Sequence, residues 1–223
     1  TKTIHISHNL DNTLQAETYQ DIVRGFTGQT SHAQPVFARI MPENEEKANV
    51  LFDTLPKREK YIALCVKGTF PLKTWPKEYF VKVVDELNKR YNASFFIVGA
   101  PNDKSYADEV IADMPVEVKN FCGQTNLVDL AAVLKRSDLF VTVDTGATHI
   151  AATTGIPMVT MYGCTSPNRW HPINKNARVL TTNEPCCPCT YRADECPTNP
   201  KPNCLWHVTS EMVLRQCYAL LKM

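Results

Sequence analysis

The stretch DLFVTVDTGATHIAATTGIPMVTMYG, residues 138–163, determines the fold class of this 223-residue chain. It opens with an apolar, β-branched run at 138–143, which is typical of a buried parallel strand. A segment rich in small residues follows at 149–155 and ends in Gly155, where a helix C-cap is expected. A second short apolar strand comes next, at 157–163. This order indicates a βαβ unit, in which ligands bind at the carboxyl ends of the strands.

The same alternation of strands and helices runs through the chain from residue 60 onward. Strands separated by helices of this length predict an α/β fold, a Rossmann-like parallel sheet with helices on both faces. Two amphipathic helices are expected before it, at 16–30 and 43–55. The other expected strands are 61–66, 93–100 and 116–123, and the other expected helices are 75–91, 103–114, 126–137 and 209–223.

Composition excludes several classes of protein. The formal net charge is +1 and no basic stripe with interleaved aromatic residues is present, so nucleic acid is not an expected partner. The sequence has no apolar run of about 18 residues, the length that predicts a transmembrane segment. Four of the nine cysteines lie in apolar segments and are expected to be buried thiols: Cys65, Cys122, Cys164 and Cys217.

Two loops that follow strands carry groups suited to a nucleotide. In the loop 66–76, Gly68 and Thr69 can approach a phosphate closely and Lys73 can supply a compact positive charge. Taken alone, this loop is equally well explained as a glycine turn with a surface lysine. In the next loop, Asp103 stands where α/β nucleotide-binding proteins hold ribose hydroxyls, although it could simply cap a helix.

The third loop is the turn after the strand 138–143. Asp144 ends that strand, and Gly146 has no side chain to keep a ligand from the backbone amides of the following helix. His149 lies one helical turn beyond Thr145 and can face the same ligand. A lone histidine is more often structural, but three polar loops converging on one edge of a sheet favour a binding site.

The sequence resembles glycosyltransferase family 9, the lipopolysaccharide heptosyltransferases. The resemblance rests on LKTWPKEYF (72–80) and on the stretch 123–172, with its Asp-Thr-Gly-x-x-His and Tyr-Gly-x-Thr-x-Pro motifs. It implies a GT-B architecture of two facing Rossmann-like domains, of which this chain resembles the carboxyl-terminal, donor-binding half. The donor-binding residues that it implies are Gly68, Thr69, Lys73, Asp103, Thr125, Asp144, Thr145, Gly146 and His149.

The resemblance also implies an activity. The donor is typically ADP-L-glycero-D-manno-heptose, the acceptor is the lipopolysaccharide inner core, and transfer is inverting and needs no metal or other cofactor. Lys73 would stabilise the leaving nucleotide diphosphate, while the catalytic base is expected in an amino-terminal acceptor domain outside this chain. The fragment alone is therefore expected to be inactive, and the enzyme is expected at the cytoplasmic face of the inner membrane of a Gram-negative-type bacterium.

We expect residues 1–58 to hold interdomain helices and a remnant of the amino-terminal half. Residues 59–223 are expected to form the nucleotide-sugar-binding domain, with an irregular excursion rich in cysteine and proline at 183–207 and a final helix. Where the family often has proline after Asp-Thr-Gly, this chain has Ala147, which leaves the particular sugar open.

Two other functions are compatible with the same residues. One is a non-catalytic nucleotide-sugar-binding module, and the other is a nucleotide-sugar epimerase with the GT-B fold. The epimerase predicts extra carboxylates near the sugar, which the sequence does not show. A dehydrogenase is disfavoured because no G-x-G-x-x-G follows any expected strand.

The excursion contains a possible metal site. Its cysteines are spaced so that four of them could hold a structural zinc ion: Cys186, Cys189, Cys196 and Cys204. Disulfides and reduced thiols are the alternatives, and the expected cytoplasmic setting disfavours disulfides. In each case we expect a structural rather than a catalytic role.

Overall fold

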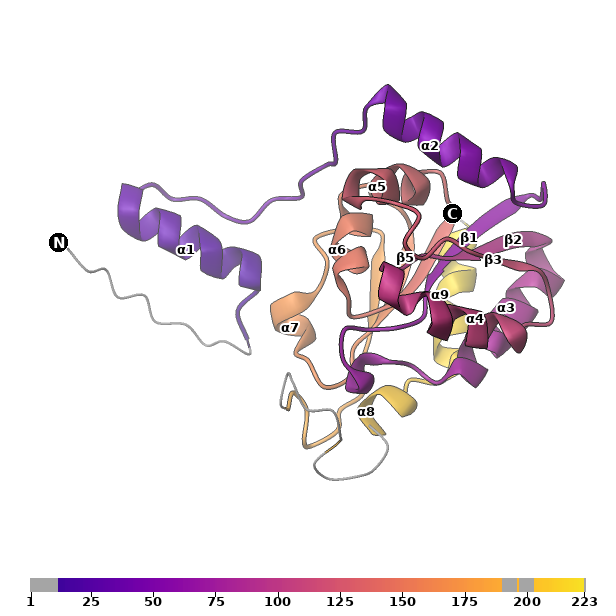
Figure 1. Cartoon of the computed structure of the whole chain (residues 1–223). Helices are drawn as coiled ribbons and strands as arrows, with labels where there is room; N and C mark the ends of the chain where they lie inside the picture. Colours follow the sequence, from indigo (N-terminus) through magenta and orange to yellow (C-terminus); the bar gives the residue numbers. More distant parts are fainter. Residues whose placement is uncertain (1–11, 190–195, 197–202, 223) are drawn as a thin grey trace.

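The computed structural model describes residues 12–189, 196 and 203–222. Its centre is a six-stranded, wholly parallel sheet with the strand order β3-β2-β1-β4-β5-β6 (Figure 1). This is the strand order of a Rossmann fold, so the predicted α/β class is confirmed. The order reverses between β1 and β4, and ligands of such sheets bind in the crevice at that point.

The strands are short and the helices that connect them are of moderate length. The strands are β1 Lys60–Cys65, β2 Ala93–Ile97, β3 Val118–Asn120, β4 Leu139–Val143, β5 Met158–Met161 and β6 Ala177–Leu180. The helices are α1 Gln15–Thr27, α2 Pro42–Asp53, α3 Lys77–Tyr91, α4 Lys104–Ala112, α5 Leu127–Lys135, α6 Gly146–Ala152, α7 Pro167–Trp170, α8 Asn203–Trp206 and α9 Ser210–Leu221, with 3-10 turns η1 Pro71–Lys73 and η2 Pro101–Asp103.

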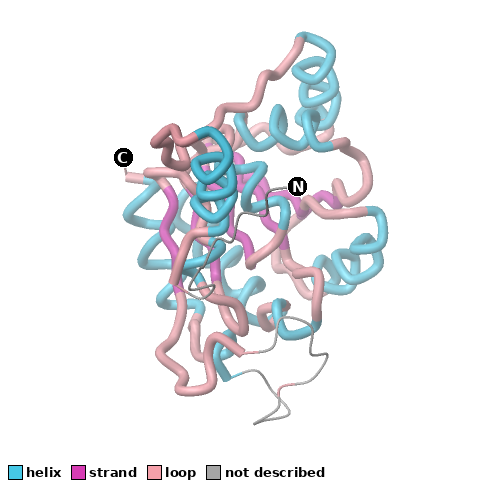
Figure 2. Tube along the Cα trace, turned by 90° about the vertical axis from the view of Figure 1, so that its left-hand side faces the viewer, coloured by secondary structure: helices cyan, strands magenta, loops and turns pink. Residues whose placement is uncertain are grey.

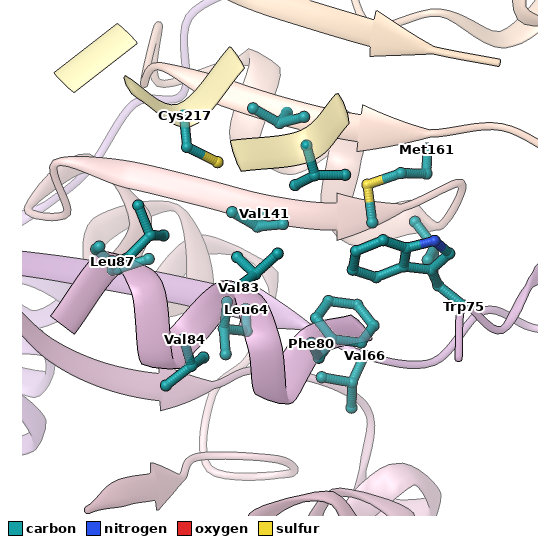
Figure 3. Close-up of a cluster of buried hydrophobic side chains, with 14 of the residues drawn as sticks. Leu64, Val66, Trp75, Phe80, Val83, Val84, Leu87, Val141, Met161 and Cys217 are labelled. Atoms are coloured by element: carbon teal, nitrogen blue, oxygen red, sulfur yellow. The ribbon is translucent and has the colours of Figure 1, made fainter. Parts of the chain in front are cut away.

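Each face of the sheet buries its own hydrophobic cluster. On one face α3 packs against α9, and Val83, Leu87 and Cys217 meet Val141 of the sheet (Figure 3). On the other face α2 packs against α5, and Phe52 contacts the ring of Phe96. Helices on both faces are what near-continuous apolar strands require, because neither face of such a sheet can be left in water.

Helix α1 lies apart from these two layers. In Figure 1 it projects to the left of the sheet, near α7, and in Figure 2 the same helical layers are seen from the side. A hydrogen bond of 2.9 Å from Arg169 Nε to Gln15 Oε1 joins it to α7. Its apolar side chains Tyr19, Ile22 and Phe26 are exposed. The helix expected at 16–30 ends at Thr27, where Gly28 with φ +70° caps it.

The structure differs from the sequence expectations at several elements. The two short helices α7 and α8 were not predicted. A sixth strand, β6, was not predicted; it is four residues long and pairs with β5 at the edge of the sheet. The strand expected at 116–123 is reduced to β3, because only three residues pair with β2. The helix expected at 149–155 begins earlier, at Gly146, because Thr145 is already extended and acts as the N-cap residue. None of the helices in the described ranges is long and apolar enough to cross a membrane.

Candidate functional site

A cavity of about 530 Å³ lies at the carboxyl ends of the strands, where the loops after β1, β2, β3 and β4 meet. Its volume is within the range of small-molecule sites. The described residues that line it are Cys65, Lys67, Gly68, Thr69, Gly99, Ala100, Pro101, Asn102, Asp103, Thr125, Asn126, Leu127, Leu130, Thr145, Gly146, Ala147 and Ile150.

The loop after β1 is held in place by two buried side chains. Leu72 and Trp75 are 4% and 0% exposed, and the Trp75 Nε1 donates a hydrogen bond of 2.7 Å to the carbonyl of Val208. The turn η1, which contains Leu72, comes back so closely that a Cβ on Gly68 would stand 2.3 Å from the Cβ of Lys73. Only glycine fits there without moving the turn, so Gly68 sets the position of Lys73.

Lys73 forms an ion pair with Asp144 at the point where the strand order reverses. The distance from Nζ to Asp144 Oδ2 is 2.7 Å, and the two side chains are 15% and 6% exposed. Thr165, in the loop after β5, donates a hydrogen bond of 2.6 Å to the same carboxylate oxygen. Because the pair is largely withdrawn from water and hydrogen-bonded, the two side chains are held in one arrangement.

The turn after β4 is tied to the sheet from both sides. Thr148 of α6 donates a hydrogen bond of 2.8 Å from Oγ1 to the carbonyl of Val143, and Thr142 bonds to the same carbonyl at 2.9 Å. These bonds fix the start of α6, whose first amides have no partner within the helix. A Cβ on Gly146 would meet no atom within 4 Å, so access to those amides is open.

Asp103 takes part in two contacts at the rim of the cavity. Its Oδ2 accepts a hydrogen bond of 2.9 Å from the backbone N–H of Ala100, and its Oδ1 lies 3.4 Å from the Nζ of Lys67. The side chain makes no cap hydrogen bond to the helix α4. The N-cap explanation of Asp103 is therefore replaced by a carboxylate that closes the turn η2 and pairs with a lysine of the neighbouring loop.

His149 faces a different cavity from the other predicted residues. It contributes to a cavity of about 460 Å³ between α1 and α6, together with His32 and Tyr19. Although the residue is exposed, the protein around its ring displaces water and lowers the pKa of the imidazole below its usual value. Asp144 opposes this lowering, whereas Lys73 adds to it. The neutral imidazole is thus the favoured form.

The thiols near the cavity are protonated at neutral pH. Burial raises the pKa of Cys65 to about 11 and the pKa of Cys122 to about 12, and the charge of Asp103 adds to both shifts. A buried thiol of this kind is inert as a nucleophile. The prediction that Cys65, Cys122, Cys164 and Cys217 are buried is confirmed.

The predicted zinc quartet is not assembled. In the part of the chain that the structure describes, which includes Cys186, Cys189, Cys196 and Cys204, no group of three or more His, Cys, Asp or Glu side chains is placed to hold a metal ion. Instead, Cys187, which the spacing argument had not included, packs against the buried cluster that contains Cys204. The reason is geometric, because sequence spacing does not fix which thiols of an irregular loop face one another.

Six of the predicted donor-binding residues line the one cavity: Gly68, Thr69, Asp103, Thr125, Thr145 and Gly146. Lys73 and Asp144 do not line it but form the ion pair beside it, and His149 lies outside it. Sequence reasoning missed two residues. Lys67 follows the buried strand β1 by two positions, which could have marked it. Thr165 belongs to the Tyr-Gly-x-Thr-x-Pro motif, which carries part of the resemblance.

A Rossmann-like sheet with such a cavity at its strand-order reversal defines a nucleotide-binding class of fold. Residues 6–199 match the family model of glycosyltransferase family 9 (heptosyltransferase), and the chain belongs to that family. It is 31% identical over 143 residues to lipooligosaccharide heptosyltransferase 2 of Haemophilus influenzae, which covers 57% of this chain and 41% of the relative.

Solved structures of the family share the fold. The glycosyl transferase family 9 protein of Veillonella parvula superposes with a TM-score of 0.78 at 24% identity, covering 94% of this chain and 60% of that one. The ADP-heptose lipopolysaccharide heptosyltransferase II of Escherichia coli gives a TM-score of 0.67 at 23% identity, over 83% and 53% of the two chains. The chain thus spans about half the length of the relatives that it matches.

Proposed function

We propose that this chain is the donor-binding half of a heptosyltransferase that transfers heptose from ADP-heptose to the lipopolysaccharide core. One observation carries the proposal: loops from four parallel strands place Thr69, Asp103, Thr125 and Thr145 around a single cavity of about 530 Å³. Membership of a heptosyltransferase family and a structural relative whose donor is ADP-heptose support the choice of sugar and base.

In this proposal each loop has one task. Asp103 accepts hydrogen bonds from ribose hydroxyls, and the backbone near Thr125 borders the base. Thr69 and the amides of the turn at Thr145 and Gly146 hold the diphosphate. His149 lines the neighbouring cavity between α1 and α6 and would approach the phosphate or the sugar from that side. Neutral polar groups and backbone amides dominate these contacts, which suits a site that must release its nucleotide after the reaction.

The chemical step that we propose is an inverting displacement without a metal ion. An acceptor hydroxyl, deprotonated by a base from the acceptor-binding half of the enzyme, attacks the anomeric carbon, and the bond to the nucleotide diphosphate breaks. Negative charge builds on the leaving oxygen, so a fixed cation stabilises the transition state more than the ground state. Lys73 can serve in this role because its ammonium has three donors and the contact with Asp144 uses one.

Calorimetry with ADP, UDP and GDP tests donor binding by this chain directly. We expect ADP to bind and the other two to bind more weakly, and Asp103→Ala to weaken all ribonucleotides. Stronger binding of UDP or GDP, or no binding of any of the three, would overturn the donor assignment. The chain alone is expected to transfer no sugar.

Turnover by the full-length enzyme tests the catalytic part. Loss of one hydrogen-bond donor to developing negative charge typically costs about 2.7–4 kcal/mol of barrier, so Lys73→Ala should lower turnover about a hundredfold or more. Unchanged turnover at saturating donor would remove Lys73 from this role.

Nucleotide binding without transfer by the full-length wild type would identify a non-catalytic module, and sugar conversion without an acceptor would identify an epimerase. We propose that the enzyme works at the cytoplasmic face of the inner membrane.

A further inference from the structure

Lys67 is a charged residue of the cavity to which the proposed mechanism gives no task. It follows β1 by two positions, and its side chain reaches across to the loop after β2, where its Nζ lies 3.4 Å from Asp103 Oδ1. It also lines the adjoining cavity of about 620 Å³, so it stands in the wall between the two. The side chain is 35% exposed, which leaves the pair partly shielded from solvent.

The formal charges around the cavity balance only because of Lys67. Among the described residues that line it, Lys67 and Asp103 are the ones with charged side chains. The next cation, Lys73, is already compensated by Asp144 at 2.7 Å. Without Lys67, the cavity would present an uncompensated carboxylate to any ligand that enters it.

An uncompensated carboxylate opposes the binding of a polyanion. A unit charge about 8 Å from another changes an equilibrium constant about 2-fold at the dielectric constant of water and about 30-fold at the value typical near protein surfaces. A nucleoside diphosphate carries more than one negative charge, whereas a nucleoside carries none. The repulsion therefore weakens the binding of the nucleoside diphosphate and leaves the binding of the nucleoside unchanged.

We propose that Lys67 is a specificity-determining residue, which permits a nucleoside diphosphate to bind next to Asp103 by neutralising that carboxylate. The inference rests on the proposed function, because it takes the ligand of this cavity to be a nucleoside diphosphate. It adds a residue that acts on the phosphate part of the ligand through Asp103 rather than by direct contact. The carboxylate can then serve the ribose without repelling the diphosphate.

The test compares ADP with adenosine by calorimetry on this chain. In Lys67→Met we expect the Kd for ADP to rise about tenfold and the Kd for adenosine to change by less than about twofold. The same substitution should have little effect on ADP when Asp103→Asn is already present, because no carboxylate is left to neutralise. Lys67→Arg should keep the affinity of the wild type, and raising the salt concentration should shrink the effect of Lys67→Met.

Lys77→Met is the matched control. Lys77 is an exposed lysine of the adjoining cavity that pairs with Asp113 at 2.7 Å, and it does not line the nucleotide cavity. This variant should bind ADP as the wild type does.

Three results would overturn the inference. Equal losses for ADP and adenosine in Lys67→Met would show that the pair only holds the two loops together. A tenfold loss that persists with Asp103→Asn would show direct contact between Lys67 and phosphate. Unchanged Kd values for both ligands would show no role at all. In each case wild-type binding of ADP leaves the proposed function standing, whereas a wild type that binds neither ligand removes both.

Discussion

Replacing Gly68 by alanine tests how the close return of the loop after β1 positions Lys73. A Cβ at this position would lie 2.3 Å from the Lys73 Cβ and 2.7 Å from its carbonyl oxygen. Non-bonded carbon atoms prefer about 3.5–4.0 Å, so η1 must move by about 1 Å or more. It cannot move cheaply, because Leu72 and Trp75 on either side are 4% and 0% exposed.

The expected cost is that of overpacking, about 1–3 kcal/mol. For a chain of this size each kcal/mol lowers Tm by about 2–4 °C, so we expect Gly68→Ala to melt about 2–12 °C below the wild type. The displaced Lys73 should also weaken ADP binding more than adenosine binding. Differential scanning calorimetry measures the first effect and titration calorimetry measures the second.

Gly146→Ala is the matched control from the same cavity. No atom lies within 4 Å of a Cβ at Gly146, so the Tm should be unchanged or slightly raised. The added methyl group would instead stand in front of the amides at the start of α6 and weaken ADP binding. If Gly68→Ala melted and bound ADP like the wild type, the packing argument for the position of Lys73 would be wrong.

Three further predictions each concern a single side chain. Thr165→Val removes a hydrogen-bond donor to the buried Asp144 carboxylate and should lower the unfolding free energy, measured by urea titration, by about 1–3 kcal/mol. Thr165→Ser keeps the hydroxyl and should retain most of that free energy. Equal losses in the two variants would contradict the hydrogen bond. Asn126→Ala removes the acceptor of two N–H groups at the start of α5 and should cost about 1 kcal/mol, measured the same way; no change would remove the cap. Burial lowers the pKa of His149 in the folded chain, so the unfolded chain binds more protons and stability should fall as the pH drops below about 6.5. Between pH 7 and pH 5 the Tm of His149→Gln should therefore fall less than the Tm of the wild type. An equal fall in both proteins would contradict this prediction.

The edge at which the site forms could be predicted from the sequence. Apolar strands followed at once by Thr69, Asp103 or Thr145 indicate binding loops, and parallel strands bring all their carboxyl ends to one side of the sheet. That rule needs no knowledge of side-chain directions, and the six lining residues follow from it. The edge strand β6 escaped prediction because a four-residue strand that includes an exposed residue gives no clear period.

The pairing of side chains could not be predicted in the same way. A lysine has four rotatable bonds and reaches several ångströms, so sequence position does not decide which carboxylate it meets. Lys73 was expected in the cavity and instead pairs with Asp144, while Lys67 had not been considered and lines it. The thiols gave the same result, since Cys187 packs against the buried cluster that contains Cys204 although their spacing matches no metal motif.

The strand order explains why the loop after β1 carries both cations. β1 lies between β2 and β4, so its loop is flanked by the loop that carries Asp103 and by the turn that carries Asp144. Lys67 pairs with the first carboxylate and Lys73 with the second. The position of this one loop therefore decides whether both carboxylates beside the strand-order reversal are neutralised. Gly68 lies between the two lysines. A substitution that shifts the loop as a unit should disturb both ion pairs together, whereas Lys67→Met and Lys73→Ala each disturb one.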